Sequence, residues 1–367
     1  MHPKLALLNL HSLKMTVIKS MEPLNVPKAD RATRIGTGIF FTIFVALAAL
    51  TAALPPVGNL SATSQEGGFA KDVSAGDTAW VMISAALVLF MTPGLAFFYG
   101  GMVSHANVIS TMFQSFVAMC VISVLWVIVG FSLAFGKDAN GNGIIGYPRT
   151  YYMFNDVGPL PIPRLCPSIP LVAFSMFMLT FAVITPALIA GGLAERINFS
   201  AWMIFISIWH LIVWCPLCHL MWHPDGLFRT WGALDFAGGT VVEMASGFAA
   251  LAGAIYIGPR KTKLNTPANI PFIMLGTAIF WFGWLGFNAG SALAANGLGT
   301  FSEDAPVLRG LFLDSLTRSL INSLTHSLTH SLTHSLTHSH HTTPHHRTAP
   351  QLPKPGPPPT LPELVAC

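Results

Sequence analysis

One segment sets the environment of the whole chain: Trp231-Gly-Ala-Leu-Asp-Phe-Ala-Gly-Gly-Thr-Val-Val-Glu-Met-Ala-Ser-Gly-Phe-Ala-Ala250 carries two carboxylates among apolar and small residues. Asp235 is predicted to be the N-cap of a membrane helix, because free amides and the positive end of a helix dipole favour an anion. Glu243 is then expected about 12 Å deeper, inside a hydrocarbon layer about 30 Å thick. Such an acid usually lines a pathway for ions, protons or substrate. A helix cap with a buried, hydrogen-bonded glutamate is the structural alternative.

The composition indicates a membrane protein. Of the 367 residues, 52% are hydrophobic and 9% are charged, whereas soluble domains are about 25% charged. The net charge of +4 is small and dispersed, and most basic residues flank apolar segments. We therefore expect lipid, and no nucleic acid, as the surroundings. The cysteines make no disulfide framework, and Cys215-Pro-Leu-Cys218 is interpreted as two small core residues instead of a redox pair.

The N-terminal region divides into a basic segment, 1–34, and an uncharged run, 35–54. This pair is typical of a signal sequence or an extra anchoring helix, with Thr51-Ala-Ala as a weak cleavage candidate. Basic residues ahead of the run predict a cytoplasmic N-terminus. Asn59-Leu-Ser61 is a candidate glycosylation acceptor on the opposite side.

Six further apolar segments are each long enough to cross a membrane. The sequence therefore predicts an all-α, polytopic membrane helix bundle. The predicted spans are 78–103, 108–135, 169–193, 198–220, 238–257 and 271–295.

The connections between these spans predict their sidedness. Ser104-His-Ala-Asn107 and Ala194-Glu-Arg-Ile197 are very short, so they are expected on one side together with Gly258-Pro-Arg-Lys-Thr-Lys263. Arginine and lysine in short loops mark that side as cytoplasmic. The longer connections, 136–168 and 221–236, are expected on the outer face, where a substrate would be met.

Aromatic side chains recur at helical spacing in two of the spans. Phe280, Trp284, Phe287 and Ser291 are predicted to share one helical face, and Phe177 pairs with a phenylalanine four residues later. Aromatic faces attract small cations. Ordinary packing explains the same spacing, since the chain has 26 phenylalanines.

Several long motifs together resemble the ammonium transporter family (Amt/Mep/Rh), in the family's order and spacing from about Asp77 to Asn296. The resemblance implies a transporter domain over 77–296, a homotrimer of eleven-helix subunits, and a narrow pore in each subunit that carries ammonium inward. The motifs are Asp77-Thr-Ala-Trp, Leu87-Val-Leu-Phe-Met-Thr-Pro-Gly-Leu-Ala-Phe-Phe-Tyr-Gly-Gly-Met102, Gly192-Leu-Ala-Glu-Arg-Ile197, Gly232-Ala-Leu-Asp-Phe-Ala-Gly-Gly-Thr-Val-Val242 and Gly283-Trp-Leu-Gly-Phe-Asn-Ala-Gly-Ser291.

The resemblance also implies roles for individual residues. Trp222, Phe181 and Ser291 match the outer site that recruits ammonium. Phe181 and Phe287 match the stacked rings that gate the pore, and Phe177 matches a further aromatic residue at the mouth.

Two acidic residues complete this set. Asp235 matches the acidic residue that holds the recruitment site together from beneath, and Glu243 falls where the family usually has the first of two histidines in mid-pore. A glutamate there resembles the fungal-type branch, and it is interpreted as a proton relay or as a stabiliser of the cation. The other pore histidine belongs to the family's second half, which is expected to be absent from this chain.

The resemblance therefore implies a multi-pass transporter of ammonium and its analogue methylammonium in the plasma membrane, without a cofactor or enzymatic activity. A non-conducting ammonium-binding receptor or regulatory subunit is the main alternative, and an inactive fragment is another. Met244-Ala-Ser246-Gly247 is similar to an intramembrane protease motif, but no later span before the tail offers a histidine base.

The C-terminal region, 301–367, has a different composition. A four-residue unit recurs from Ser323-Leu-Thr-His326 to Ser335-Leu-Thr-His338, and further histidines and prolines follow. The composition predicts a low-complexity, disordered tail. A metal-binding tail is the less favoured alternative, since histidines four apart share a helical face.

Overall fold

The computed structural model describes three parts of the chain: residues 31–55, 73–260 and 266–295. The contacts divide the chain into the units Met1–Ser315 and Leu316–Cys367, and every described residue belongs to the first unit. The predicted histidine-rich tail, most of the basic N-terminal segment and the sequon at Asn59 lie outside the described residues.

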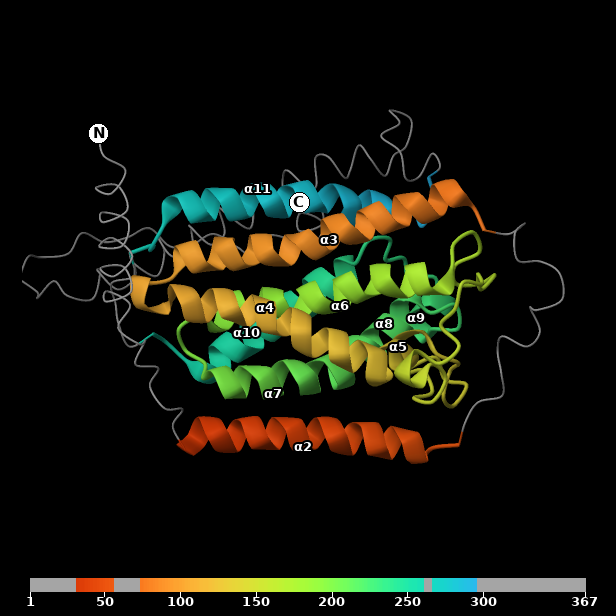
Figure 1. The fold of residues 1–367 in the computed structure, drawn as a ribbon, viewed down its shortest axis with the longest axis horizontal. Helices are drawn as coiled ribbons and strands as arrows, with labels where there is room; N and C mark the ends of the chain where they lie inside the picture. Colours follow the sequence, from red (N-terminus) through yellow and green to blue (C-terminus); the bar gives the residue numbers. More distant parts are fainter. Residues whose placement is uncertain (1–30, 56–72, 261–265, 296–367) are drawn as a thin grey trace, which may run out of the picture. The chain divides into compact units, whose positions relative to one another are not determined.

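The described residues form a bundle of apolar helices, and they contain no β-strand (Figure 1). Three of the bundle's spans contain a turn of wider π-helix, namely η2 (Trp126–Gly130), η4 (His210–Trp214) and η5 (Gly239–Met244). The α-helices are α2 (Arg31–Ala53), α3 (Ala75–Met102), α4 (Val108–Leu125), α5 (Phe131–Phe135), α6 (Leu171–Leu193), α7 (Phe199–Trp209), α8 (Cys215–Trp222), α9 (Leu227–Thr230), α10 (Ala245–Ile257) and α11 (Ile270–Gly290).

Six helical segments of the described chain are long and apolar enough to cross a membrane, which confirms the predicted all-α, polytopic fold. Five of them agree with a predicted span to within five residues at each end, whereas the fourth, predicted to end at residue 220, continues to Thr230. Continuous helix through the π-turns joins α4 to α5, α7 to α8 and η5 to α10. The six segments are Ala75–Met102, His105–Phe135, Leu171–Leu193, Phe199–Thr230, Gly239–Ile257 and Ile270–Gly290.

Helix α2 overlaps the predicted uncharged run 35–54 and begins a few residues earlier. It is hydrogen-bonded near its C-terminus by two tyrosines of the connection before α6. The Tyr152 hydroxyl donates to the carbonyl of Ala48, and the Tyr147 hydroxyl donates to the carbonyl of Pro55, each at 2.9 Å.

Glycines allow α3 and α11 to pack closely in antiparallel orientation. A Cβ atom added at Gly276 would lie 2.3 Å from the amide nitrogen of Phe98, and one added at Gly290 would lie 2.4 Å from Cβ of Ser84. Side chains larger than hydrogen therefore do not fit between the backbones. Close packing of this kind replaces the hydrophobic drive that lipid does not supply between membrane helices.

One end of the bundle, which we call the short-loop end, is held together by Glu195. Its carboxylate accepts hydrogen bonds from the amide and hydroxyl of Ser104 and from the Asn107 side chain, at 2.6 to 3.1 Å, and it pairs with Arg260. Arg196 donates to the carbonyl of Gly258 at 2.6 Å. The three connections predicted to share a side therefore meet here.

The environment of Glu195 favours its charged form. Partial burial opposes ionisation, but the hydrogen bonds from Ser104 and Asn107 and the positive charge of Arg260 together hold the pKa of Glu195 below its usual value. A charged carboxylate that binds several donors is a strong local tie between loops.

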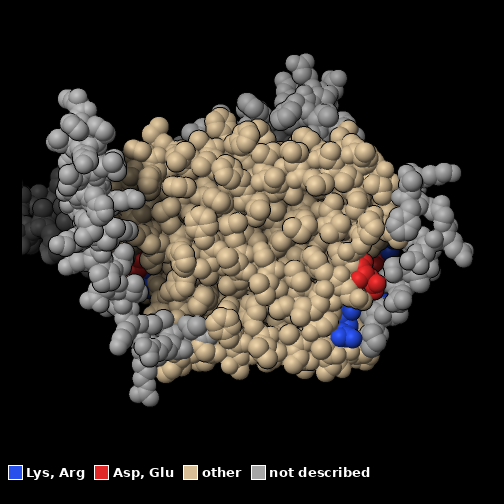
Figure 2. Space-filling view, in the orientation of Figure 1, with Lys and Arg blue, Asp and Glu red and all other residues tan. Residues whose placement is uncertain are grey.

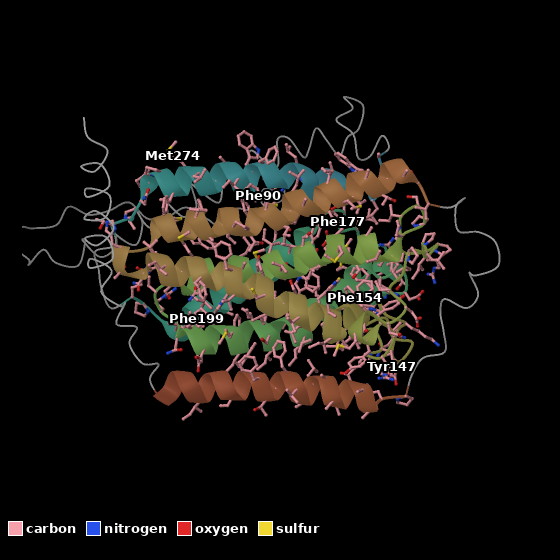
Figure 3. The ribbon with its side chains drawn as sticks, in the orientation of Figure 1. Phe90, Tyr147, Phe154, Phe177, Phe199 and Met274 are labelled. Atoms are coloured by element: carbon pink, nitrogen blue, oxygen red, sulfur yellow. The ribbon has the colours of Figure 1, made fainter. Side chains whose placement is uncertain are left out.

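The flank of the bundle is apolar. Figure 2 shows Lys, Arg, Asp and Glu near the ends of the helices, while the surface between them carries none in this view. Large hydrophobic side chains such as Met274 on α11, labelled in Figure 3, are well exposed there. Water would penalise this surface, whereas acyl chains would not. The four described cysteines are free, and Cys215 and Cys218 are buried as predicted.

Candidate functional site

Asp235 lies at the opposite end, the long-loop end, which carries the connections between α5 and α6 and between α9 and η5. Its carboxylate accepts hydrogen bonds from the amides of Gly238, Thr240 and Val241 at 2.6 to 3.0 Å. The predicted capping role is present, but the N-cap position itself belongs to Gly238, in the left-handed region at φ 105°. The turn that follows Asp235 brings the free amides at the start of η5 within hydrogen-bonding distance of its side chain.

This later helix start changes the expected depth of Glu243. Helix η5 begins at Gly239, so Glu243 lies four residues into the helix and about 6 Å along its axis. The predicted depth of about 12 Å assumed an unbroken helix from Asp235, whereas the residues between Asp235 and Gly239 form a turn. Glu243 is half-buried, and its main-chain carbonyl accepts a hydrogen bond from the Ser246 hydroxyl at 3.2 Å.

Trp222, the last residue of α8, is fixed to the Asp235 turn. Its indole nitrogen donates to the main-chain carbonyl of Asp235 at 3.0 Å. Asp235 therefore has two structural roles. Its side chain caps the start of η5, and its main-chain carbonyl fixes the ring of Trp222. The ring itself is half-buried.

Four of the predicted aromatic residues meet in one chain of ring contacts. The ring of Phe181 on α6 contacts Trp222 edge-on, with centroids 5.7 Å apart at 87°. Phe181 also contacts Phe177, labelled in Figure 3, at 4.9 Å, and Phe287 of α11 at 4.4 Å. Phe177, Phe181 and Phe287 are fully buried. Three helices thus contribute rings to one cluster.

The predicted aromatic face of α11 is also observed. Phe280, Trp284 and Phe287 contact one another in sequence, with centroids 5.2 and 4.9 Å apart. Ser291 follows one turn later, and its hydroxyl donates to the carbonyl of Phe287 at 2.7 Å. This bond uses the hydroxyl proton and leaves the oxygen lone pairs as acceptors.

Two residues in contact with this cluster were not singled out from the sequence as site residues. The indole nitrogen of Trp214 donates to the Thr185 hydroxyl at 3.0 Å, and the ring of Trp214 contacts that of Trp222. The spacing of eight residues between the tryptophans, about two helical turns, was the available signal. The spacing does not predict the contact with Thr185, because that contact depends on how α6 packs against η4.

A polar group at the long-loop end was also missed. His219 is fully buried on α8, its Nδ1 lies 3.0 Å from the carbonyl of Ala134, and its Nε2 lies 3.3 Å from Asp138. Its ring stacks on His223, with centroids 4.3 Å apart. These contacts fasten the start of the long connection after α5 to α8. No group of three or more metal-ligating side chains occurs in the described ranges.

The six apolar helices define a multi-pass membrane protein. The model of the Ammonium Transporter Family matches residues 79–314. The chain belongs to this family, as the sequence motifs predicted.

Curated relatives agree with this assignment. The chain is 44% identical over 227 residues to a putative ammonium transporter of Methanothermobacter thermautotrophicus, covering 62% of this chain and 54% of that protein. It is 46% identical over 247 residues to an ammonium transporter of Mycobacterium tuberculosis, covering 61% and 51%. The chain spans about half the length of the curated relatives it matches.

Solved structures give the same result for the fold. Mep2 of Saccharomyces cerevisiae is 34% identical with a TM-score of 0.56, covering 61% of this chain and 50% of that chain. Mep2 of Candida albicans has the same identity, TM-score and coverage. The matched part is therefore the fold of ammonium transporters over about half of their length.

Proposed function

We propose that this chain takes up ammonium at the long-loop end and carries it across the membrane, with Trp222 and Phe181 as the outer recruitment site. One observation carries the proposal: the ring of Phe181 contacts Trp222 edge-on and also contacts the ring of Phe287. Ring faces in a water-poor site attract a small cation by about 2 kcal/mol. The acceptor oxygen of Ser291 would complete the site.

The buried rings then act as a gate. Phe181 and Phe287 close the path beneath the recruitment site, so an ion that enters must first lose its water. Ammonium can give up a proton and continue as neutral ammonia, whereas K⁺ and Na⁺ keep their charge and face a prohibitive desolvation cost. Phe177 supports the outer face of Phe181.

Glu243 is proposed as the proton relay or as a second station for the cation. It falls at the position of a pore histidine in the family motif, and it lies in the wide turn η5 with both carboxylate oxygens buried. A carboxylate holds a cation by charge, while imidazole holds a neutral amine by hydrogen bonding. The replacement of histidine by glutamate would therefore shift the position in the pore at which ammonium loses its proton.

Three further expectations concern the extent of the domain, its assembly and its membrane. The family assignment supports a transporter domain over 77–296, assembly as a homotrimer, and residence in the plasma membrane. Crosslinking of the intact chain in isolated membranes tests the assembly, since a trimer gives a ladder that ends at three subunits.

Uptake of labelled methylammonium into cells that lack their own ammonium carriers tests the function. We expect saturable uptake that unlabelled ammonium competes away, and loss of most uptake at low substrate concentration in Trp222→Ala. Trp231→Ala is the matched control, because its ring is 72% exposed at the same end of the bundle. Ammonium binding without uptake would favour the receptor alternative, and equal uptake by both variants would remove Trp222 from the site.

A further inference from the structure

Two hydrogen bonds in series connect η4 to the main chain of the gate phenylalanine. The indole nitrogen of Trp214 donates to the hydroxyl of Thr185 at 3.0 Å, and that hydroxyl donates to the carbonyl of Phe181 at 2.6 Å. Both side chains are fully buried. A hydroxyl has one proton to give, so the short bond to Phe181 leaves a lone pair that faces the indole donor. The direction of both bonds is therefore fixed.

The helix turn at this point needs side-chain support. Pro186 follows Thr185 inside α6, and proline has no amide proton to donate to the carbonyl four residues earlier, that of Ala182. The turn that carries Phe181 therefore has one main-chain hydrogen bond fewer than a regular helix. Two hydrogen bonds hold this turn in one position: the one from Thr185 to Phe181 and the one from Trp214 to Thr185, which we call the Trp214 brace.

Trp214 also contacts the other half of the recruitment site. Its ring lies against Trp222, with centroids 6.5 Å apart at 79°. On its other sides it stacks on His210 at 5.3 Å and contacts Trp126 at 5.9 Å. A ring held by three aromatic neighbours and a hydrogen bond has little freedom to move. Trp214 therefore touches Trp222 by its ring and reaches Phe181 through Thr185.

We propose that Trp214 and Thr185 are positioning residues that set the separation of Trp222 from Phe181 and thereby set the preference of the mouth for ammonium over methylammonium. This inference rests on the proposed recruitment site. The two cations differ by one methyl group, so a small change in the gap between the rings alters one affinity more than the other. A brace that only stabilised the fold would alter both equally.

Conservative variants separate these two roles. Thr185→Val removes the hydroxyl and keeps the shape, Thr185→Ser restores a hydroxyl, and Trp214→Phe removes the indole donor and keeps an aromatic ring. Trp202→Phe is the matched control, because Trp202 is also fully buried and donates its indole proton to the carbonyl of Gln114, at 3.2 Å. Its ring contact is with Phe205 of the same helix.

The measurement is KM for ammonium and for methylammonium in the same cells, with the thermal unfolding of each purified variant. We expect the ratio of the two KM values to change about fivefold in Thr185→Val and in Trp214→Phe, the equivalent of one hydrogen bond. The double variant should show no further change, because both substitutions break one chain. Thr185→Ser and Trp202→Phe should keep the wild-type ratio.

Other results overturn the proposal in distinguishable ways. If the wild type transports both amines, but Thr185→Val and Trp214→Phe lose stability at an unchanged KM ratio, the brace is structural and the proposed function stands. If the wild type takes up neither amine, the proposed function fails and the positioning role fails with it. Where Trp214→Phe does not fold, the comparison of Thr185→Val with Thr185→Ser decides the question.

Discussion

The indole nitrogen of Trp222 donates to the main-chain carbonyl of Asp235 at 3.0 Å, although 13 positions separate the two residues. The carboxylate of the same Asp235 binds the first amides of η5. The end of one membrane span and the start of the next are therefore fixed by a single residue. This arrangement places the Trp222 ring before any substrate arrives, which lowers the cost of ordering it on binding.

Removal of the Asp235 carboxylate should destabilise the long-loop end. We expect Asp235→Ala to lower the free energy of unfolding by about 2 kcal/mol, because the amides at the start of η5 lose their acceptor. Thermal unfolding in detergent, followed by tryptophan fluorescence, measures the loss. Asp225→Ala is the control, since its exposed ion pair with Arg164 is worth less than about 1 kcal/mol. Equal stability of the two variants would contradict the capping role.

Replacement of the gate ring should weaken ion discrimination more than it weakens the fold. Phe181→Leu keeps most of the apolar volume, at a cost below about 1.5 kcal/mol, but removes the ring that contacts Trp222. We expect added K⁺ to inhibit ammonium uptake in this variant. Phe174→Leu alters a buried phenylalanine of the same helix whose ring contact is with Phe135. Inhibition of the same size in both variants would remove Phe181 from selectivity.

The charge of Glu243 is tested by Glu243→Gln, which keeps the shape of the side chain. We expect the current that accompanies ammonium uptake to fall and its dependence on pH to flatten, because an amide neither takes up a proton nor balances a cation. Ser246→Ala is the control for local main-chain disturbance, since its hydroxyl bonds only to the carbonyl of Glu243 among the contacts of the described residues. An unchanged current and pH profile in Glu243→Gln would make the carboxylate structural.

The Glu195 cluster predicts a defined pH dependence of stability. The pKa of Glu195 is lowered in the folded protein, so its contribution is complete above the ordinary glutamate value, about 4.3. It is lost as the pH falls through the lower, folded value. We expect Glu195→Gln to have a lower thermal midpoint than the wild type at neutral pH, with a gap that narrows only below about pH 4. A gap that is constant down to the acid limit would show that the charge of Glu195 contributes nothing.

Much of the fold was predictable because a membrane imposes strong local rules. Runs such as Leu171–Leu193 must satisfy their own backbone hydrogen bonds in lipid, so length and apolar composition alone predicted each span. The face shared by Phe280, Trp284 and Phe287 followed from helical spacing in the same way. The prediction that the short loops share one end of the bundle followed from their length, and the contacts of Glu195 confirm that these loops meet.

The turn after Asp235 and the brace from Trp214 were not predictable in this way. The left-handed backbone at Gly238 delays the start of η5, which hydropathy does not detect, so the helix was predicted to begin too early. The pairing of Trp214 with Thr185 joins positions 29 apart through the contact of two helices. The sequence by itself determined which segments are helical and, in α6 and α11, which residues share an aromatic face, because those properties depend on neighbours along the chain. Only the tertiary structure decided which rings meet and what holds them, because the directions of their hydrogen bonds depend on how the helices pack.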